Sequence, residues 1–325
     1  MIPGACKNRS SLQSCECRFL NVGIIMPFDQ SQNLNFLWLE LTNRCNLECT
    51  HCYAGSSPTA VDAAPLSLSE YQDIIRSAAQ HGCSAVQFIG GEPTLNKMLP
   101  ELIEFSSRTG FTFIEVFSNL VSMTDAQIAD YQRHGIHLAT SIYGASSEVH
   151  DAVTTRPGSF ERTTRNMSRA LDAGIPFRVS VIRMETNLDE IDEAVQWLKQ
   201  LGIDNVGIDD ARAFGRAREE KPCDMGELCG ECAGGTLCVD PNGKVSPCIM
   251  SRAWGVGDVR EDGFSTLLTS QRLKDVRSQI AERVAERMGG CNPSNPNPCA
   301  PDQGGPCIPC NPNGNCGPNK CQPHP

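Results

Sequence analysis

The sequence contains no apolar run long enough to span a membrane and no block of basic residues. A bilayer-spanning helix needs about 18 consecutive apolar residues, and none occurs in the 325 residues of the chain. Acidic residues outnumber basic ones, 38 to 28, which gives a formal net charge of −10. Without a concentrated positive patch, neither nucleic acid nor a membrane is expected as the main partner.

An export signal is also missing from the first thirty residues. The run from Cys15 to Arg18 interrupts any apolar core that a signal peptide would need. We therefore expect a cytoplasmic protein. Aromatic residues are sparse, at 6%, but the 40% of hydrophobic residues is ample for a packed core. A chain of this length suits one large domain with a small appendage.

Cysteine, by contrast, is abundant. The chain has 18 cysteines, and many of them occur in tight groups. Disulfide frameworks are typical of short secreted domains that lack a core, whereas grouped cysteines in a long cytoplasmic chain usually bind metal. We therefore favour metal or iron–sulfur ligation over disulfides.

The middle of the chain alternates short apolar strands with amphipathic helices. Strands are predicted over residues 37–41, 85–89, 113–117, 138–142, 177–182 and 206–208. Helices are predicted over residues 69–80, 98–108, 125–133, 159–171 and 188–201. Such strand–helix units in succession imply an α/β fold with a parallel sheet and helices outside. Because eight units close a barrel, six strands predict a partial (β/α)6 TIM-like barrel with its chemistry at the C-terminal strand ends.

Three segments are expected along the chain. They are an irregular N-terminal segment (1–34), the partial barrel (35–215) and a small cysteine-rich domain (216–325). The last contains a predicted hairpin at residues 241–243 and a helix over about 265–288. Its tail, 291–325, has six cysteines and ten prolines, with Ile308 as its one large aliphatic residue. Since such a tail cannot bury enough apolar surface to fold alone, we expect metal to hold it together.

A group of three cysteines follows the first predicted strand at the spacing Cys-x3-Cys-x2-Cys. These are Cys45, Cys49 and Cys52. Three thiolates on one loop can bind three irons of a [4Fe–4S] cluster and leave the fourth iron open to a small-molecule chelator. The alternative is a structural zinc loop completed by His51 or His81, although zinc loops usually pair two Cys-x2–4-Cys units.

The second predicted strand ends in Gly-Gly-Glu-Pro, residues 90–93. The two glycines allow the backbone to approach a ligand closely, and Glu92 supplies a hydrogen-bond acceptor. Taken alone, the same four residues suit an ordinary strand-to-helix turn. Because they lie one strand–helix unit after a three-cysteine loop, these residues indicate a ligand-binding turn far more specifically.

Together these motifs resemble the radical S-adenosylmethionine (SAM) superfamily over about residues 35–215. The resemblance implies that Cys45, Cys49 and Cys52 bind a [4Fe–4S] cluster whose open iron is chelated by the amino and carboxylate groups of SAM. It also implies a set of SAM contacts. These are His51, Gly90, Gly91, Glu92, Pro93, Ser118, Asn119, Ser141 and Ile208.

The roles implied for these residues differ. Residues 90–93 match the turn that binds the SAM amine, and Ser118 and Asn119 match a contact to its ribose or methionine part. His51 and Ile208 stand where the family places residues near the adenine. Ser141 begins Ser-Ile-Tyr-Gly, where the family has Ser-Ile-Asp-Gly. Tyr143 therefore replaces the usual Asp, so no role is carried over to it.

The C-terminal cysteines resemble an auxiliary-cluster module called SPASM, or its shorter relative, the twitch domain. The resemblance predicts one or two auxiliary [4Fe–4S] clusters. The first would be bound by Cys232, Cys238, Cys248 and Cys321, with a hairpin gathering the first three. The tail motif Cys-x2-Cys-x5-Cys-x4-Cys, which runs from Cys307 to Cys321, has one residue more in its last spacing than the family motif.

The second cluster would be bound by Cys307, Cys310 and Cys316. Its last ligand would be Cys291 or Cys299, or the site would be open. Cys223 and Cys229 are unassigned alternatives, Cys83 is expected to be a small buried hydrophobe, and a zinc-bound tail is the competing interpretation.

The resemblance implies an enzyme that reductively cleaves SAM to a 5′-deoxyadenosyl radical, which abstracts a substrate hydrogen. The electron would come from a donor such as flavodoxin or ferredoxin. The SPASM-like tail favours maturation of a ribosomally synthesised peptide by crosslinking, epimerisation or dehydrogenation. The alternatives are oxidation or decarboxylation of a small molecule (a sugar, nucleoside or cyclitol), or a non-catalytic metal-binding scaffold. Because little chain precedes residue 36, a separate protein is expected to bind a leader peptide.

Overall fold

The computed structural model describes residues 34–287, which form a single nine-stranded sheet of order β6-β5-β4-β3-β2-β1-β7-β8-β9. The first six strands are parallel neighbours in sequence order. Their bounds are β1 (Phe36–Glu40), β2 (Ala85–Ile89), β3 (Phe113–Phe117), β4 (His137–Ile142), β5 (Phe177–Arg183) and β6 (Val206–Asp210). The expected partial barrel of six strands is confirmed.

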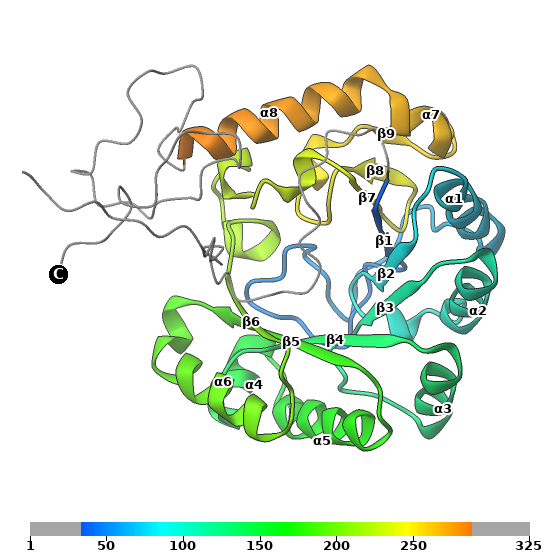
Figure 1. Cartoon of the computed structure of the whole chain (residues 1–325). Coiled ribbons are helices and arrows are strands. Elements are labelled where there is room, and N and C mark those ends of the chain that lie inside the picture. The colour runs from blue at the N-terminus through cyan, green and yellow to red at the C-terminus, as the bar shows by residue number, and fades with distance from the viewer. Residues whose placement is uncertain (1–33, 288–325) are drawn as a thin grey trace, which may run out of the picture.

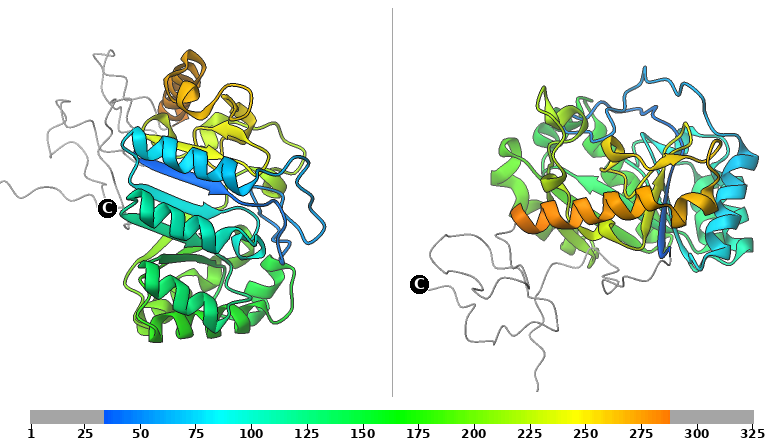
Figure 2. Two further views of the ribbon diagram at one scale, coloured as in Figure 1. Left: turned by 90° about the vertical axis from the view of Figure 1, so that its right-hand side faces the viewer. Right: turned by 90° about the horizontal axis from the view of Figure 1, so that it is seen from above.

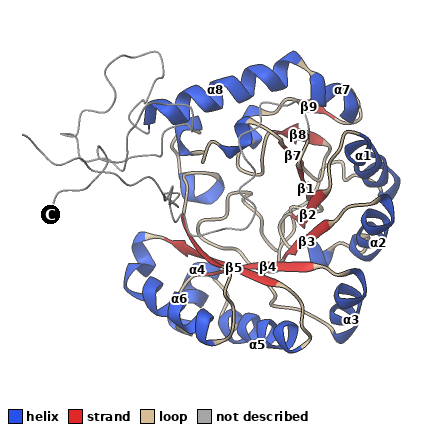
Figure 3. Ribbon diagram, in the orientation of Figure 1, coloured by secondary structure: helices blue, strands red, loops and turns tan. Residues whose placement is uncertain are grey.

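Helices cover the outer face of these strands (Figures 1 and 3). Their bounds are α1 (Leu68–Gln80), α2 (Leu99–Thr109), α3 (Asp125–His134), α4 (Ser147–Thr154), α5 (Ser159–Asp172) and α6 (Ile191–Gln200). Local sequence sets several ends: Ser67 and Thr124 form capping boxes, and Gly110 ends α2 in the left-handed conformation. Within residues 34–287, no helix combines the length and apolarity that a membrane crossing requires.

The third segment extends the barrel sheet. It contributes β7 (Thr236–Val239), β8 (Lys244–Ser246), β9 (Gly257–Asp258), α7 (Phe264–Thr269) and α8 (Gln271–Arg287). The predicted hairpin is present, because β7 and β8 pair antiparallel across residues 241–243. The strand β7 also pairs in parallel with β1, which the sequence did not predict. The auxiliary segment is therefore continuous with the barrel.

The helix predicted over 265–288 is two helices. Ser270, between α7 and α8, is extended (ψ 146°), and its backbone N–H and side chain both bond to the Leu267 carbonyl. The predicted apolar face of α8 is buried as expected, with Leu273 and Ile280 fully enclosed. Figure 2 shows α8 lying along the outside of the molecule, where it packs against the short turns at 225–227 and 231–233.

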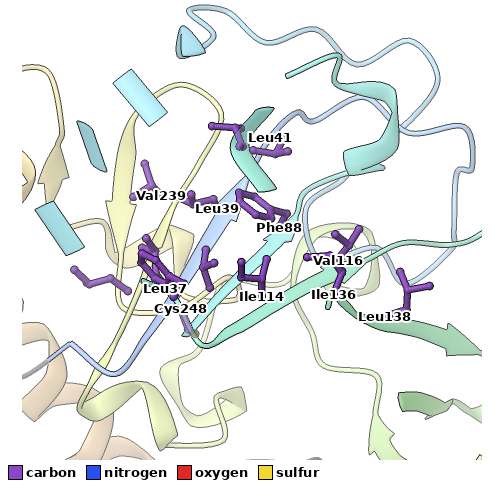
Figure 4. Packing of buried hydrophobic residues seen from close by; sticks show 14 of the residues in the cluster. Leu37, Leu39, Leu41, Phe88, Ile114, Val116, Ile136, Leu138, Val239 and Cys248 are labelled. Atoms are coloured by element: carbon purple, nitrogen blue, oxygen red, sulfur yellow. The ribbon is translucent and has the colours of Figure 1, made fainter. Parts of the chain in front are cut away.

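One hydrophobic core runs from the barrel into the third segment. Leu37 and Leu39 of β1 are fully buried, as are Phe88 of β2 and Val239 of β7. Figure 4 shows these side chains in the same cluster as Cys248. The core therefore fixes the auxiliary hairpin against the first barrel strand.

Candidate functional site

The three cysteines of the motif lie on the loop that follows β1, and they are close enough to influence one another's charge. Burial raises the pKa of Cys45 to about 12, with the Glu92 carboxylate and the Cys52 thiol adding to the effect. Burial and the other two thiols likewise raise the pKa of Cys49 to about 12. Such thiols keep their protons until a bound cation displaces them, which fits a metal ligand set.

Hydrogen-bond donors already point at one of these sulfurs. The backbone N–H of Leu47 lies 3.4 Å from Cys45 Sγ, and Asn119 Nδ2 lies 3.6 Å from it. Donors to a ligand sulfur stabilise its thiolate and tune the potential of an attached cluster. Asn119, which the sequence assigned to SAM, is thereby placed beside a predicted iron ligand.

The cysteine loop, residues 43–53, is supported from one side by α4 and the turn after it. The N–H of Thr50 donates to the Val153 carbonyl at 2.9 Å, and Arg156 Nη1 donates to the Asn46 carbonyl at 2.6 Å. The helix α4 was not predicted, because eight residues carry too little periodicity to stand apart from the neighbouring α5. Its place explains why two helices separate β4 from β5.

The segment after β6 supports the cysteine loop from another side. Arg216 donates from Nε to the Cys49 carbonyl at 2.8 Å and from Nη2 to the Ser56 carbonyl at 2.6 Å. Its backbone N–H donates to the Cys52 carbonyl at 3.0 Å. Gly215 permits this approach, because a Cβ there would overlap that same carbonyl oxygen. No local sequence pattern predicts this role of Arg216, because its partners are backbone carbonyls, which any residue supplies.

The two glycines of the Gly-Gly-Glu-Pro turn pack against the cysteine loop. A Cβ on Gly90, whose φ is +138°, would lie 2.6 Å from the Thr42 carbonyl oxygen, and a Cβ on Gly91 would overlap that of Arg44. The N–H groups of Gly91 and Glu92 donate to these two carbonyls, at 2.6 and 2.9 Å. The sequence predicts that these glycines let a ligand approach the backbone closely. In the structure, the group that lies against them is the backbone of residues 41–44.

Glu92 joins the ends of β2 and β3. It is 1% exposed, and its Oε1 accepts from Ser118 Oγ at 2.8 Å while its Oε2 accepts from the Asn119 N–H at 2.9 Å. Burial raises the pKa of Glu92, and the donated hydrogen bonds oppose that rise. The structure thus brings three predicted SAM contacts together next to Cys45. Pro93 follows directly and starts a short 3-10 turn.

His51 and Tyr143 form the opposite side of the candidate site. Their rings meet edge-to-face with centroids 4.8 Å apart, and Tyr143 lies beside Ser141 and Cys49. Burial lowers the pKa of His51 to about 4, and its buried Nδ1 has no hydrogen-bond partner within residues 34–287. His51 is therefore a neutral ring with one free polar atom, as a residue near a nucleobase would be. Ile208 is partly buried on β6.

The auxiliary cysteines of the described residues lie near one another. Interaction between the neighbouring thiols of Cys232 and Cys248 raises the pKa of Cys232 and lowers that of Cys248. Cys229 is close enough for its charge to act on Cys232, and Cys248 acts on Cys229. Cys238 is close enough to Cys248 for that thiol to raise its pKa, and its Sγ also lies 3.5 Å from Oε2 of Glu40, on the barrel strand β1. The hairpin thus gathers Cys232 and Cys248 as expected, with Cys229 nearby.

The remaining predicted ligands lie outside the described residues. They are Cys291, Cys299, Cys307, Cys310, Cys316 and Cys321. In the part that the structure describes, no three Cys, His, Asp or Glu side chains converge on a point where one metal ion would sit. A cubane cluster does not need such convergence, because each thiolate binds a different iron. Cys83 is buried in the core, as predicted.

Two family models match the sequence. The radical SAM superfamily matches residues 39–198, and the iron–sulfur cluster-binding domain SPASM matches residues 229–300. Among curated proteins, the antilisterial bacteriocin subtilosin biosynthesis protein AlbA of Bacillus subtilis is 24% identical over 281 residues, which is 76% of this chain and 62% of AlbA. The sporulation killing factor maturation protein SkfB of the same species is 30% identical over 56% of this chain and 43% of its own length.

A third relative is the PqqA peptide cyclase of Rhizobium meliloti, 30% identical over 56% of this chain and 48% of the cyclase. The chain thus spans about half of the length of the curated relatives it matches. Among solved structures, SuiB of Streptococcus suis bound to its precursor peptide SuiA superposes with a TM-score of 0.65 at 15% identity, over 80% of this chain and 72% of SuiB. A second, anSMEcpe with bound AdoMet and a peptide, gives 0.60 at 12%, over 77% and 83%. These likenesses establish the fold.

Proposed function

Because the chain belongs to the radical SAM enzyme superfamily and carries a SPASM iron–sulfur domain, we propose that it modifies a ribosomally synthesised peptide. When bound, the cluster and SAM supply a radical that removes a hydrogen atom from an unactivated C–H bond. The peptide class is supported by the relatives, whose names describe bacteriocin biosynthesis, killing-factor maturation and peptide cyclisation. Crosslinking, epimerisation and dehydrogenation are the modifications we consider.

One observation carries the proposal. Residues from three successive strand ends meet at one sulfur: Cys45 after β1, Glu92 after β2 and Asn119 after β3. Chemistry in a barrel of this kind is performed at the C-terminal ends of its strands. The convergence joins a predicted iron ligand to two predicted SAM contacts.

Some residues of this site are proposed to bind the cluster or SAM, and others hold those residues in place. We propose that Cys45, Cys49 and Cys52 bind the first cluster and that the turn at 90–93 receives the SAM amine. Glu92 keeps Ser118 and Asn119 in place, because both donate to its carboxylate. The neutral ring of His51 is proposed to offer the adenine an apolar face.

For the first auxiliary cluster we propose Cys232, Cys238 and Cys248 as ligands, completed by Cys321 from the tail. Cys248 influences the pKa of both Cys232 and Cys238, and Cys229 is near enough to be an alternative ligand. A second cluster on the remaining tail cysteines, an electron donor such as flavodoxin or ferredoxin, and a separate leader-binding protein complete the proposal.

The test is anaerobic reconstitution of the full chain with iron and sulfide, followed by incubation with SAM, a strong reductant and candidate precursor peptides. Two or three [4Fe–4S] clusters correspond to about 8–12 irons. We expect 5′-deoxyadenosine and a peptide of altered mass. Bound zinc without absorbance near about 400 nm would contradict the iron–sulfur assignment. Deoxyadenosine formed with small molecules and with no peptide would overturn the peptide assignment alone.

The matching variant replaces Cys45, Cys49 and Cys52 with Ala. It should lose about four irons and all SAM cleavage while retaining the auxiliary iron. The control is Cys83→Ala, because Cys83 is a buried cysteine of the core that belongs to neither group. Undiminished deoxyadenosine formation by the triple variant would refute the site.

A further inference from the structure

A buried carboxylate stands at the point where the barrel meets the auxiliary segment. Glu40, the last residue of β1, is completely enclosed. Tyr53 donates its hydroxyl to Oε1 at 3.0 Å, and Cys238 lies 3.5 Å from Oε2. Arg252 donates from Nε to Oε2 at 2.9 Å and pairs through Nη2 with Oε1 at 2.6 Å. Because an unpaired buried charge is costly, this carboxylate requires such partners.

Arg252 comes from the auxiliary segment, four residues after Cys248, yet it reaches both ends of the cysteine loop. Its Nη1 donates to Asn43 Oδ1 at 3.2 Å, two residues before Cys45. Its guanidinium also lies over the ring of Tyr53, 5.8 Å from the centroid, directly after Cys52. One side chain of the auxiliary segment therefore contacts the residues that begin and end the loop.

The same contacts lead to the turn that we assign to SAM. Asn43 lies between Thr42 and Arg44, whose carbonyl oxygens accept the N–H groups of Gly91 and Glu92. A shift of Asn43 would therefore move the backbone to which that turn is bonded. Burial lowers the pKa of Arg252, but the nearby Glu40 charge outweighs it and leaves the pKa above its usual value. The guanidinium is thus a permanent cation at this position.

Docking of the two segments does not by itself require Arg252. Arg260, also in the auxiliary segment, pairs with Glu70 on α1 and donates to the carbonyls of Ala64 and Pro65. It is as rich in contacts across the junction as Arg252, but none of these partners is next to a cysteine of the loop. The two arginines therefore offer a matched comparison between docking and loop positioning.

We propose that Arg252 is a positioning residue, through which the auxiliary segment holds the cysteine loop in the shape that binds SAM. In this arrangement Cys238 donates a hydrogen bond to the same Glu40 carboxylate. The inference rests on the proposed function, because it takes SAM to be the ligand of the loop.

The experiment measures SAM binding without turnover. Full-length protein is reconstituted with iron, reduced, and titrated with SAM while the electron paramagnetic resonance spectrum of the cluster is followed. We expect Arg252→Met to weaken SAM binding at least tenfold at unchanged iron content, and Arg260→Met to bind SAM as the wild type does. Arg252→Lys keeps the charge beside Glu40 but lacks the fork that reaches Asn43. It should restore folding fully and SAM affinity in part.

The outcomes separate the two proposals. A wild-type spectrum that does not respond to SAM overturns the proposed function. A responsive wild type with unchanged affinity in Arg252→Met, or an equal loss in Arg260→Met, overturns the role of Arg252 alone. If Arg252→Met does not fold, Arg252→Lys decides, and wild-type affinity in that variant overturns the proposal.

Discussion

Gly91 shows how closely the SAM turn and the cysteine loop are packed. An added Cβ would overlap the Arg44 carbonyl oxygen, and Gly91 does not have a positive φ, so the cost of a side chain is steric. We predict that Gly91→Ala lowers the free energy of unfolding by about 1–3 kcal/mol, the usual cost of overpacking. It should also weaken iron retention. Chemical denaturation and iron analysis would measure both.

The control for this prediction is Gly255→Ala. At Gly255 the nearest atoms to a new Cβ are 3.5 Å away, at ordinary contact distance. It should therefore change stability by less than about 1 kcal/mol. Equal effects from both substitutions would show that the spacing between turn and loop is not tightly fixed.

His150 makes stability depend on pH. It is 1% exposed in α4, burial lowers its pKa to about 4, and Asp151 only partly opposes this. The unfolded chain, with a histidine pKa near 6.5, binds the proton first as the pH falls. The stabilisation is therefore complete above about pH 6.5 and is lost towards pH 4, by up to about 3 kcal/mol.

Urea denaturation of the wild type and of His150→Phe at several pH values would check this prediction. The phenyl ring keeps the aromatic contacts to Tyr143 and Phe160 but cannot take up a proton. The difference in stability between the two proteins should change between pH 6.5 and 4. A constant difference would mean that His150 takes up its proton at the same pH in the folded and the unfolded state.

At the scale of single residues, the sequence was most informative where chemistry needs a fixed spacing. The closeness of Cys45, Cys49 and Cys52 could be predicted, because thiolates that bind one cluster from a short loop need such a spacing, and the structure places the three thiols near one another. Arg216 and Arg252 could not. Their partners are backbone carbonyls and a carboxylate distant in the sequence, and no local pattern records such contacts.

At the scale of elements, the segment after β6 holds the cysteine loop in place through hydrogen bonds from Arg216. Arg216→Met removes one side-chain hydrogen bond to the Cys49 carbonyl of that loop and one to the Ser56 carbonyl just after it. We expect the reconstituted variant to lose iron from the first cluster several-fold faster when challenged with a chelator. The control is Arg108→Met on α2, whose side chain is 78% exposed. Identical rates of iron loss in the two variants would show that the hydrogen bonds of Arg216 do not protect the cluster.

Periodicity identified the elements that bury one regular face. The six barrel strands and the helices α1, α2, α3, α5 and α6 were predicted, with ends displaced by a few residues. Periodicity did not predict the features that depend on strand pairing or on where an element ends. The strand β6 extends to Asp210 because its last residues pair with the end of β5, including a salt bridge to Arg183. The break between α7 and α8 at Ser270 could not be predicted, because apolar residues recur at helical spacing on both sides of it.

At the scale of the molecule, the tail should depend on metal for its structure. Truncation after Gly290 leaves α8 complete and removes six cysteines. A structural metal can supply folding free energy on the order of 10 kcal/mol. We predict a loss of four or more irons, with SAM cleavage preserved and peptide product absent. Full iron content together with normal product would show that the tail is dispensable.

The overall architecture could be predicted from the sequence only as far as its local repeats. Strand–helix alternation indicated a partial barrel, and the cysteine-rich composition after residue 215 indicated a second unit. The pairing of β7 with β1 could not be predicted, because it joins two short strands without any shared motif. That pairing turns the expected boundary between domains into a shared sheet.

The β1–β7 pairing also bears on how the protein is made. Phe36 and Thr236 are paired in the sheet, so about 200 residues must be added to the nascent chain after β1 before its second neighbour exists. At about 5–20 residues per second, translation takes on the order of 10–40 s to supply β7. During that time one edge of β1 remains available to other chains. Added chaperones should therefore raise the soluble yield more for fragments ending before residue 236, which can never cover this edge, than for the full chain.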